Sequence, residues 1–240
     1  MTGIVGLHGG GEFLAGDERF LRRVLEATGS VSGDALRVVI VPTAAARGRP
    51  DLAAQHGVDA FGAAADAAGI DVAIEVATVI DADGAADPAA ADRLAGADVI
   101  HLPGGDPDLI PTLYPGSAAW AAMTAAYERG ATIVGASAGA MALAPWTWTP
   151  AGGIDGLDLV PGIVVLPHAD AASWSRNVAR YRPMAPAGLG VLGLAERTGV
   201  LVHADGRWEV VGEGMVRWLP AGADPDETIV ARNGERLDPA

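Results

Sequence analysis

Short apolar runs alternate with helical patterns along most of the chain, and this alternation restricts the fold more than any other feature. Strands are expected at Gly3–Leu7, Leu36–Val41, Asp71–Ala77, Asp98–Leu102, Ala131–Gly135, Gly162–His168 and Val191–Leu194. Helices are expected between them at Asp17–Thr28, Asp51–Ala68, Ser117–Arg129 and Ala171–Tyr181, with a further one beginning at Asp87 and Pro88. Strands joined by helices pair in parallel, and the helices then cover both faces of the sheet. The sequence therefore predicts an α/β fold with a mostly parallel sheet.

The carboxyl-terminal part has a different pattern. Apolar runs on both sides of Asp205 and Gly206 predict a β-hairpin over Gly199–Gly212. No internal repeat and no low-complexity linker divides the 240 residues, so we expect a single domain over residues 1–240. In a sheet of this type, the active site is expected at the carboxyl ends of the parallel strands.

The composition excludes several kinds of chemistry. The chain has no cysteine, which rules out disulfides, thiolate metal sites and cysteine nucleophiles. No His, Asp and Glu cluster has metal-ligand spacing, so we expect neither a metal nor another cofactor. The formal net charge is −14, and such a surface repels phosphate groups. Nucleic acids and anionic membranes are therefore not expected as partners.

The sequence is typical of a cytoplasmic protein. The amino terminus, MTGIVGLHGG, has no basic region followed by a long apolar segment, so no signal peptide is expected. Residues 131–148 carry no charge, but Gly135, Gly139 and Pro145 interrupt them. A strand, a turn and a helix explain this segment better than a membrane span does.

The stretch TIVGASAGAMALA, Thr132–Ala144, changes from a strand pattern to a helical pattern at a serine. Ser137 has a glycine two residues away on either side, Gly135 and Gly139. A sharp strand-to-helix turn pushes the central side chain out of the backbone and requires small neighbours, as in Gly-x-Ser-x-Gly nucleophile turns. A close crossing of a helix and a strand would use the same small residues. The position between an expected strand and an expected helix favours a catalytic serine.

A catalytic serine needs a base, and the chain has five histidines. His56, in an Ala-rich helix, and His101, inside a strand, are interpreted as surface or core residues. His168 ends a strand, so its side chain is expected at the same rim of the sheet as Ser137. His203, in the hairpin, is the rival candidate.

The loop LPGGDPD follows the strand at Asp98–Leu102. Its glycines, Gly104 and Gly105, allow backbone amides to approach a ligand closely. One of these amides is a candidate oxyanion donor, together with the amide of Ala138 at the expected helix amino terminus. A plain turn before the next helix explains the same loop residues.

With these motifs placed, the sequence resembles the dipeptidase E and cyanophycinase family of serine peptidases. This family is a branch of the class I glutamine amidotransferase-like, flavodoxin-like fold. The matching segments are VPTAAA (Val41–Ala46), LPGGDPDLI, GASAGAMALA, GLDLVPGIVVLPHAD and GLGVLGLAERTGVLVHADG. They extend over about Gly3–Gly214, and the Ser-Ala-Gly-Ala turn with Pro-His downstream is their specific part.

The resemblance implies a serine peptidase with Ser137 as nucleophile and His168 as general base. It also implies that the amides of Gly105 and Ala138 form the oxyanion hole. The chemistry of the residues agrees, because an imidazole can take the serine proton during attack and return it to the leaving amine.

The acid of the triad departs from the family's pattern. The family usually places it shortly after the nucleophile, where this chain offers only Asp155. Glu196, in LAERTG, matches a glutamate of the family's closing segment and is assigned as the triad acid. Asp155 is the alternative, and a solvated carboxylate at a strand end is the plain explanation for either residue.

The substrates that the resemblance implies are small peptides, among them aspartyl dipeptides and β-aspartyl peptides. An acidic substrate needs a cation near the site, and Arg176 and Arg180 share one face of the helix expected after His168. These arginines, with Gly104 and Asp106, are expected to bind the substrate, although a solvated helix face also explains the arginines. A homodimer is one assembly that the sequence leaves open.

Two other functions remain open from the sequence. One is an α/β-hydrolase-type esterase, because HGGG (His8–Gly11) resembles a lipase oxyanion motif and His203 would serve as its base. Only one expected strand precedes HGGG, however, and that fold would leave LPGGD unexplained. The other is a non-catalytic binding domain that kept the amidotransferase-like fold.

Overall fold

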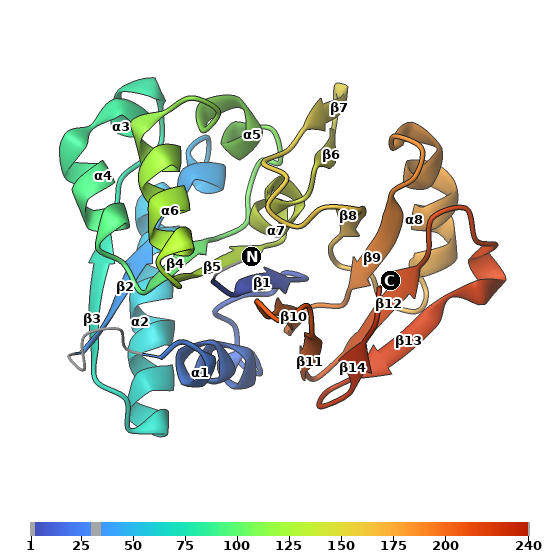
Figure 1. Cartoon of the computed structure of the whole chain (residues 1–240), viewed down its shortest axis with the longest axis horizontal. Coiled ribbons are helices and arrows are strands. Elements are labelled where there is room, and N and C mark those ends of the chain that lie inside the picture. The colour runs from blue at the N-terminus through green and yellow to red at the C-terminus, as the bar shows by residue number, and fades with distance from the viewer. Residues whose placement is uncertain (1–2, 30–34, 240) are drawn as a thin grey trace.

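Five adjacent parallel strands form the larger part of the largest sheet in the computed structural model, which describes residues 3–29 and 35–239 (Figure 1). Their spatial order is β3 (Val72–Val76), β2 (Leu36–Ile40), β4 (Val99–Leu102), β5 (Thr132–Ala136) and β1 (Val5–His8). Beyond β1 the sheet continues with the antiparallel strands β10 (Thr198–Val202), β11 (Trp208–Gly212) and β14 (Arg236–Leu237). The pairing of β10 with β11 confirms the predicted hairpin.

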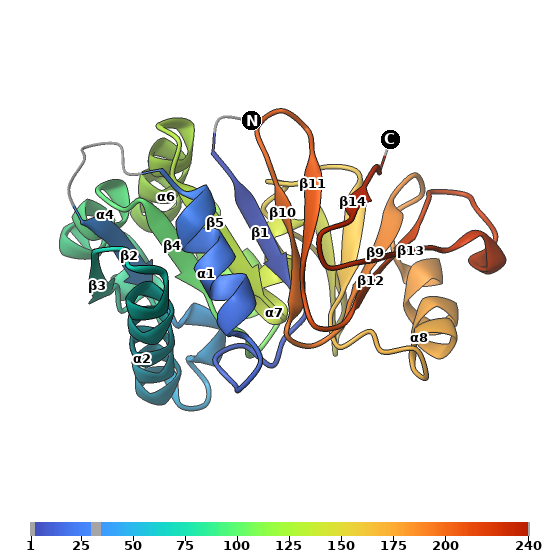
Figure 2. The same cartoon turned by 90° about the horizontal axis from the view of Figure 1, so that it is seen from below.

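Helices cover both faces of this sheet, as predicted. One face packs against α1 (Glu18–Ala27) and α2 (Pro50–Ala68), and the other against α3 (Ala82–Ala86), α4 (Pro88–Ala95) and α6 (Ala118–Glu128) (Figures 1 and 2). Phe20 and Phe61 fill the first interface, while Leu94 and Met123 fill the second, and all four are fully buried. Apolar strands covered on both sides in this way explain the continuous apolar runs of the sequence.

The helix ends follow from local chemistry that the sequence already contains. The Oγ of Ser117 accepts a hydrogen bond from the Trp120 amide at 3.1 Å at the start of α6. At the start of α4, the Asp87 side chain accepts one from the Ala89 amide at 3.0 Å, with Pro88 in the first turn. These caps fix where the predicted helices begin.

A second sheet lies beside the first and was not distinguished by the sequence analysis. It contains β13 (Ile229–Arg232), β12 (Met215–Leu219), β9 (Gly190–Leu194) and β8 (Ile163–Leu166), in that spatial order, and α8 (Trp174–Tyr181) packs on it (Figures 1 and 2). The expected strands at Gly162–His168 and Val191–Leu194 are therefore real, but they belong to this smaller sheet. A buried apolar run has the same pattern in either sheet, so periodicity alone could not assign them.

Several short elements complete the fold. These are the hairpin β6 (Trp146–Thr149) and β7 (Gly152–Asp155), the helices α5 (Leu109–Leu113) and α7 (Ala138–Leu143), and the 3-10 turns η1 (Thr43–Ala45), η2 (Arg182–Met184) and η3 (Pro225–Glu227). Within the two described ranges, no helix is both long enough and apolar enough to span a membrane.

The register of the central strands defines the edge where the predicted site residues gather. His8 pairs with Ala136 on one side and with Gly199 on the other, so β1 and β5 end where the antiparallel strand β10 begins. The other end of β10, Val202, pairs with Val5 at the start of β1. Residues after β5 and residues after β10 therefore lie at opposite ends of the strands.

A cluster of charged side chains connects α1 to the antiparallel strand β11. Glu209 on β11 accepts hydrogen bonds from Arg23 at 2.6 and 2.9 Å and from Arg207 at 3.1 Å, and it pairs with His203 at 3.0 Å. The hydrogen bonds from Arg23 are the main reason that the pKa of Glu209 is lowered from 4.5 to about 2. Because this pKa is depressed in the folded state, the carboxylate stabilises the fold above pH 4.5, and this contribution is lost as the pH falls toward 2.

Glu209→Gln is expected to lower the free energy of unfolding by about 1–2 kcal/mol at pH 7, because the charged hydrogen bonds are lost. Urea denaturation of the variant and the wild type at a series of pH values measures the difference. It should be constant from pH 7 to about pH 5 and should shrink at lower pH, where the wild-type carboxyl is protonated on unfolding. Glu75→Gln, at an exposed pair with Arg37 at 3.2 Å, is the control and should change the free energy by less than about 0.5 kcal/mol. A difference in unfolding free energy that does not change with pH would contradict the lowered pKa of Glu209.

Candidate active site

Ser137 lies on the sharp turn between β5 and α7 and has an unusual backbone conformation. Its φ is 48° and its ψ is −111°, which few residues other than glycine adopt. A Cβ on Gly135 would overlap the backbone of Gly139, and a Cβ on Gly139 would overlap the carbonyl of Leu102. The two glycines that flank the serine are therefore required by the close approach of α7 to β4 and β5. The turn leaves the Ser137 side chain partly exposed among buried neighbours.

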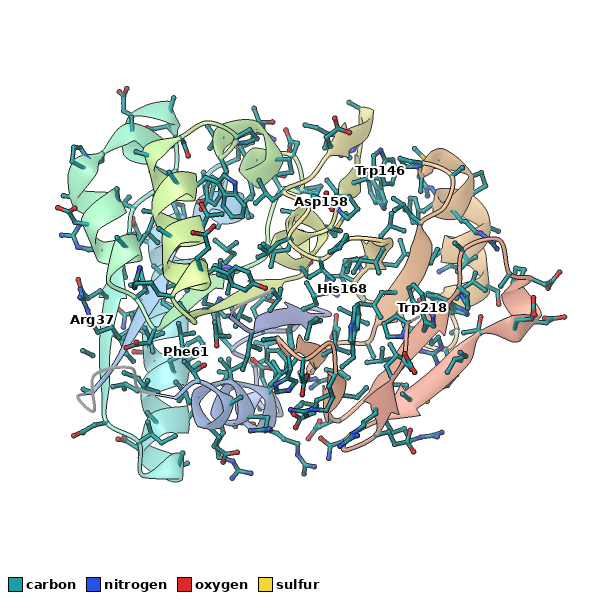
Figure 3. The ribbon with its side chains drawn as sticks, viewed as in Figure 1. Arg37, Phe61, Trp146, Asp158, His168 and Trp218 are labelled. Carbon is teal, nitrogen blue, oxygen red and sulfur yellow. The ribbon has the colours of Figure 1, made fainter. Side chains whose placement is uncertain are left out.

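His168 faces Ser137 from the smaller sheet. It follows β8, and in Figure 3 it lies between the two sheets. Its Nε2 is 3.0 Å from Ser137 Oγ, and its own amide donates to the carbonyl of Gly9 at 2.8 Å. The histidine also has a positive φ, 51°, so the backbone is turned to present the ring to the larger sheet. The structure thus brings together the predicted serine and its first candidate base.

Glu196 completes a continuous series of side chains. It follows β9, and its Oε1 is 3.0 Å from His168 Nδ1. A carboxylate only accepts hydrogen bonds, so Nδ1 carries the proton and Nε2 is free to accept from the serine hydroxyl. Asp155, the alternative acid, ends β7 opposite Trp146, and the carboxylate that accepts from Nδ1 is that of Glu196 instead.

The HGGG segment lies along this series of side chains. A Cβ on Gly10 would overlap the His168 ring, and a Cβ on Gly11 would lie 3.3 Å from Glu196 Cβ. Both glycines have positive φ, 102° and 69°. Sequence analysis connected HGGG only with the esterase alternative. The sequence signal for packing against His168 and Glu196 was a run of three glycines directly after a predicted strand.

His8, at the start of that segment, is buried and holds it in place. Its Nε2 pairs with Asp17 at 2.9 Å, and its Nδ1 accepts from the Gly10 amide at 3.3 Å. The imidazole therefore supports the backbone of the glycine segment. The backbone carbonyl of His8 also accepts a hydrogen bond from the Ser137 amide at 2.9 Å.

The LPGGD loop borders Ser137 on another side. A Cβ on Gly104 would lie 3.0 Å from Ser137 Cβ and 2.8 Å from Glu12 Oε1, and the Gly104 amide donates to that oxygen at 2.7 Å. Gly105 has a φ of 151°, and a Cβ there would overlap the carbonyl of Ala44. As the first residue of α7, Ala138 has an amide that no preceding helical turn satisfies. Sequence analysis missed Glu12, because a single glutamate in a loop gives no pattern.

The rest of this loop is involved in ion pairs. Arg47 makes two hydrogen bonds of 2.9 Å to Asp108 and lies 3.8 Å from Asp106. The hydrogen bonds from Arg47 lower the pKa of Asp108. Asp106, predicted to bind substrate, is therefore already close to a cation at the rim of a surface cavity of about 530 Å³.

The other histidines lie away from Ser137. His101 is buried between the rings of Phe13 and Phe61, and burial lowers its pKa to about 3. His56 is exposed on α2. His203 follows β10 at the opposite edge of the sheet and pairs with Glu209, so the esterase alternative lacks a base within reach of Ser137.

The two predicted arginines lie on α8 and are exposed. The charge of Arg176 contributes to the lowered pKa of Asp170, although a hydrogen bond from the Ser173 backbone is the main cause. The guanidinium of Arg180 lies 5.1 Å from the centre of the Tyr181 ring, which stacks on Trp148 at 4.6 Å. Trp146 and Trp174 are buried in the core cluster beside the smaller sheet.

No group of three metal-ligating side chains is found among residues 3–29 and 35–239. The arrangement at Ser137 is instead that of a serine hydrolase, with a hydroxyl, an imidazole and a carboxylate in series.

Comparison with known proteins defines the class more closely. The model of the family described as Peptidase family S51 matches residues 7–209. The chain belongs to this family, and it is a serine-type peptidase. None of the curated proteins compared with the chain matches it.

Two solved structures share the fold. A peptidase from an acI-B1 actinobacterium has a TM-score of 0.82 and 22% sequence identity, over 99% of this chain and 97% of that one. A putative peptidase E protein from Listeria monocytogenes EGD-e has a TM-score of 0.59 and 16% identity, over 89% of this chain and 99% of that one.

Gly10→Ala is expected to slow labelling of the serine by a fluorophosphonate about 100-fold, because the new methyl group must displace the His168 ring from Ser137. The rate of labelling, followed by intact-protein mass spectrometry, measures the effect. Gly188→Ala is the matched control: its φ of 88° carries similar backbone strain, but no atom lies within 4 Å of the added methyl group. Equal labelling rates in the two variants would show that the glycine segment does not position the imidazole.

Proposed function

We propose that the protein hydrolyses small peptides through a triad of Ser137, His168 and Glu196. The observation that supports the proposal is the pair of 3.0 Å contacts that join the three side chains, one to each nitrogen of the imidazole. Membership of a serine peptidase family agrees with this chemistry.

The mechanism follows from the donors and acceptors. His168 Nε2 takes the proton of the Ser137 hydroxyl as the oxygen attacks the peptide carbonyl. Glu196 accepts from Nδ1, which fixes the tautomer and stabilises the imidazolium that forms. The imidazolium then protonates the leaving amine, and water hydrolyses the acyl ester by the same proton transfers in reverse.

The amides of Gly105 and Ala138 are proposed to hold the oxyanion. Ala138 directly follows the nucleophile at the start of α7, and Gly105 lies in the loop that packs beside Ser137. Two such donors, fixed by the backbone before the substrate arrives, are what a tetrahedral intermediate requires.

Aspartyl dipeptides and β-aspartyl peptides are the proposed substrates. Arg176 and Arg180, on the helix that follows His168, are proposed to bind the acidic group, together with Gly104 and Asp106 of the loop after β4. Arginine suits this role because its planar group can make two parallel hydrogen bonds to a carboxylate.

Ser137→Ala and His168→Ala are expected to abolish both dipeptide turnover and fluorophosphonate labelling. Glu196→Gln should lower kcat by roughly 10²- to 10⁴-fold, because the amide favours the wrong imidazole tautomer. A coupled assay for released amino acids measures turnover. His203→Ala is the control and should retain wild-type activity, since it lies at the other edge of the sheet. Loss of activity in Asp155→Asn, with Glu196→Gln active, would instead assign the acid to Asp155.

Arg176→Ala and Arg180→Ala are each expected to raise KM for an Asp-X dipeptide by about 10-fold and to leave KM for a neutral dipeptide unchanged. Steady-state kinetics on a panel of Asp-X, β-Asp-Arg and neutral dipeptides provide the measurement. Arg93→Ala, on the distant helix α4, controls for the loss of one positive charge. Equal effects on acidic and neutral dipeptides would exclude recognition of the acidic group by these arginines.

A further inference from the structure

Glu12 places a carboxylate beside the nucleophile that the proposed triad does not use. It directly follows the glycine segment that lies along His168 and Glu196, and it is partly buried. Its Oε1 accepts from the Gly104 amide at 2.7 Å. A single point, the Cβ position of Gly104, is 2.8 Å from this oxygen and 3.0 Å from Ser137 Cβ, so Glu12 Oε1 and Ser137 Cβ both lie beside Gly104 and close to each other.

This carboxylate has no counter-ion in the part of the chain that the structure describes. The acidic residues of the neighbouring loop, Asp106 and Asp108, share Arg47, and Glu196 pairs with His168. No arginine or histidine within residues 3–29 and 35–239 ion-pairs with Glu12, and its one hydrogen bond leaves most of its acceptor positions available.

An uncompensated negative charge next to Ser137 opposes the proposed reaction. Attack on a carbonyl creates an oxyanion close to the serine, and two like charges at this range repel each other strongly in a partly buried site. The position of Glu12 is therefore favourable only when a cation lies between the carboxylate and the reacting carbonyl. Since no side chain of the described protein supplies that cation, the substrate is the remaining source.

We propose that Glu12 binds the α-ammonium group of the residue whose carbonyl Ser137 attacks, so that the enzyme releases amino-terminal residues only. The inference rests on the proposed role of Ser137 as nucleophile. In an α-linked amino-terminal residue, the ammonium nitrogen is two bonds from the carbonyl carbon, about 2.5 Å, and in a β-aspartyl residue it is one bond farther. A carboxylate that lies close to Ser137 beside Gly104 is within hydrogen-bond reach of that nitrogen. The ammonium then cancels the charge of Glu12 when the oxyanion develops.

A purely structural role for Glu12 makes a different prediction. If the side chain only holds the LPGGD loop through the Gly104 amide, then glutamine can replace it, because its amide oxygen accepts the same hydrogen bond. If the charge binds an ammonium group, glutamine keeps the loop in place but loses the substrate cation. Glu12→Gln therefore separates the two roles without removing the contact to Gly104.

The test uses two phosphonates that differ only in the ammonium group: diphenyl 1-aminoethylphosphonate and diphenyl ethylphosphonate. In both, Ser137 Oγ forms a bond to phosphorus, phenoxide leaves, and His168 takes the serine proton. Rates of labelling, followed by mass spectrometry of the full-length protein, report on the reaction without any choice of peptide sequence.

The wild type should be labelled about 10- to 100-fold faster by the amino compound. In Glu12→Gln this preference should disappear, and labelling by the compound without an amine should become faster, because the charge beside the developing oxyanion is gone. A preference that survives in Glu12→Gln would overturn the inference. Slower labelling of this variant by both compounds would overturn it as well, and would assign Glu12 to loop support.

Failure of the triad would be recognised separately. If neither phosphonate nor a fluorophosphonate labels Ser137 in the wild type, then the proposed function and this inference both fail. If both phosphonates label Ser137 equally fast in the wild type, and Ser137→Ala abolishes labelling, then only the role of Glu12 is excluded.

Discussion

The close approach of α7 to the central strands is the constraint on which the site depends. Gly135 and Gly139 let the helix backbone contact β5 and the Leu102 carbonyl, and Ser137 is forced into a conformation with φ of 48°. Such a conformation costs free energy, of the order of 1–3 kcal/mol, and it is retained only because the surrounding core is closely packed. Every residue of α7 is buried, which provides that packing. The exposed hydroxyl is thus a product of the core rather than of a flexible loop.

The three proposed catalytic side chains come from two sheets, so their alignment depends on how the sheets are joined. Ser137 follows β5 of the larger sheet, while His168 and Glu196 follow β8 and β9 of the smaller one. The glycine segment after β1 makes the connection through its backbone. The carbonyl of Gly9 accepts from the His168 amide, and that of Gly10 accepts from the Arg197 amide, both at 2.8 Å. These backbone hydrogen bonds join the two sheets directly, and the His8 side chain holds the glycine segment that makes them.

Much of the fold was predictable, because it depends on local patterns. The strand and helix at Thr132–Ala144, the caps at Asp87 and Ser117 and the hairpin at Gly199–Gly212 were all read from short stretches of sequence. The smaller sheet was not, because a buried run such as Ile163–Leu166 has no feature that selects one sheet over another. Its partner strands β12 and β13 were missed for a different reason: β12 has an arginine within its apolar run, and β13 is largely exposed.

The candidate site shows the same division between local and distant information. Ser137 and its glycines could be predicted from spacing, because the strain at the turn is local. Glu196 was assigned from the family resemblance and not from spacing, and the contact of Gly10 with His168 was missed, since Gly10 lies far from His168 in the sequence. The role of Glu12 follows only from the packing of its loop against Gly104.

The exposure of the imidazole and its carboxylate has a consequence for the acyl ester that we propose forms on Ser137. His168 and Glu196 each keep about half of their side-chain surface accessible, 50% and 49%. In the proposed mechanism, water can therefore approach the imidazole once the first product has left. Water is far more concentrated than any dissolved amine, so it is the expected acceptor of the acyl group. An open site of this kind favours complete hydrolysis over the transfer of the acyl group to a second peptide.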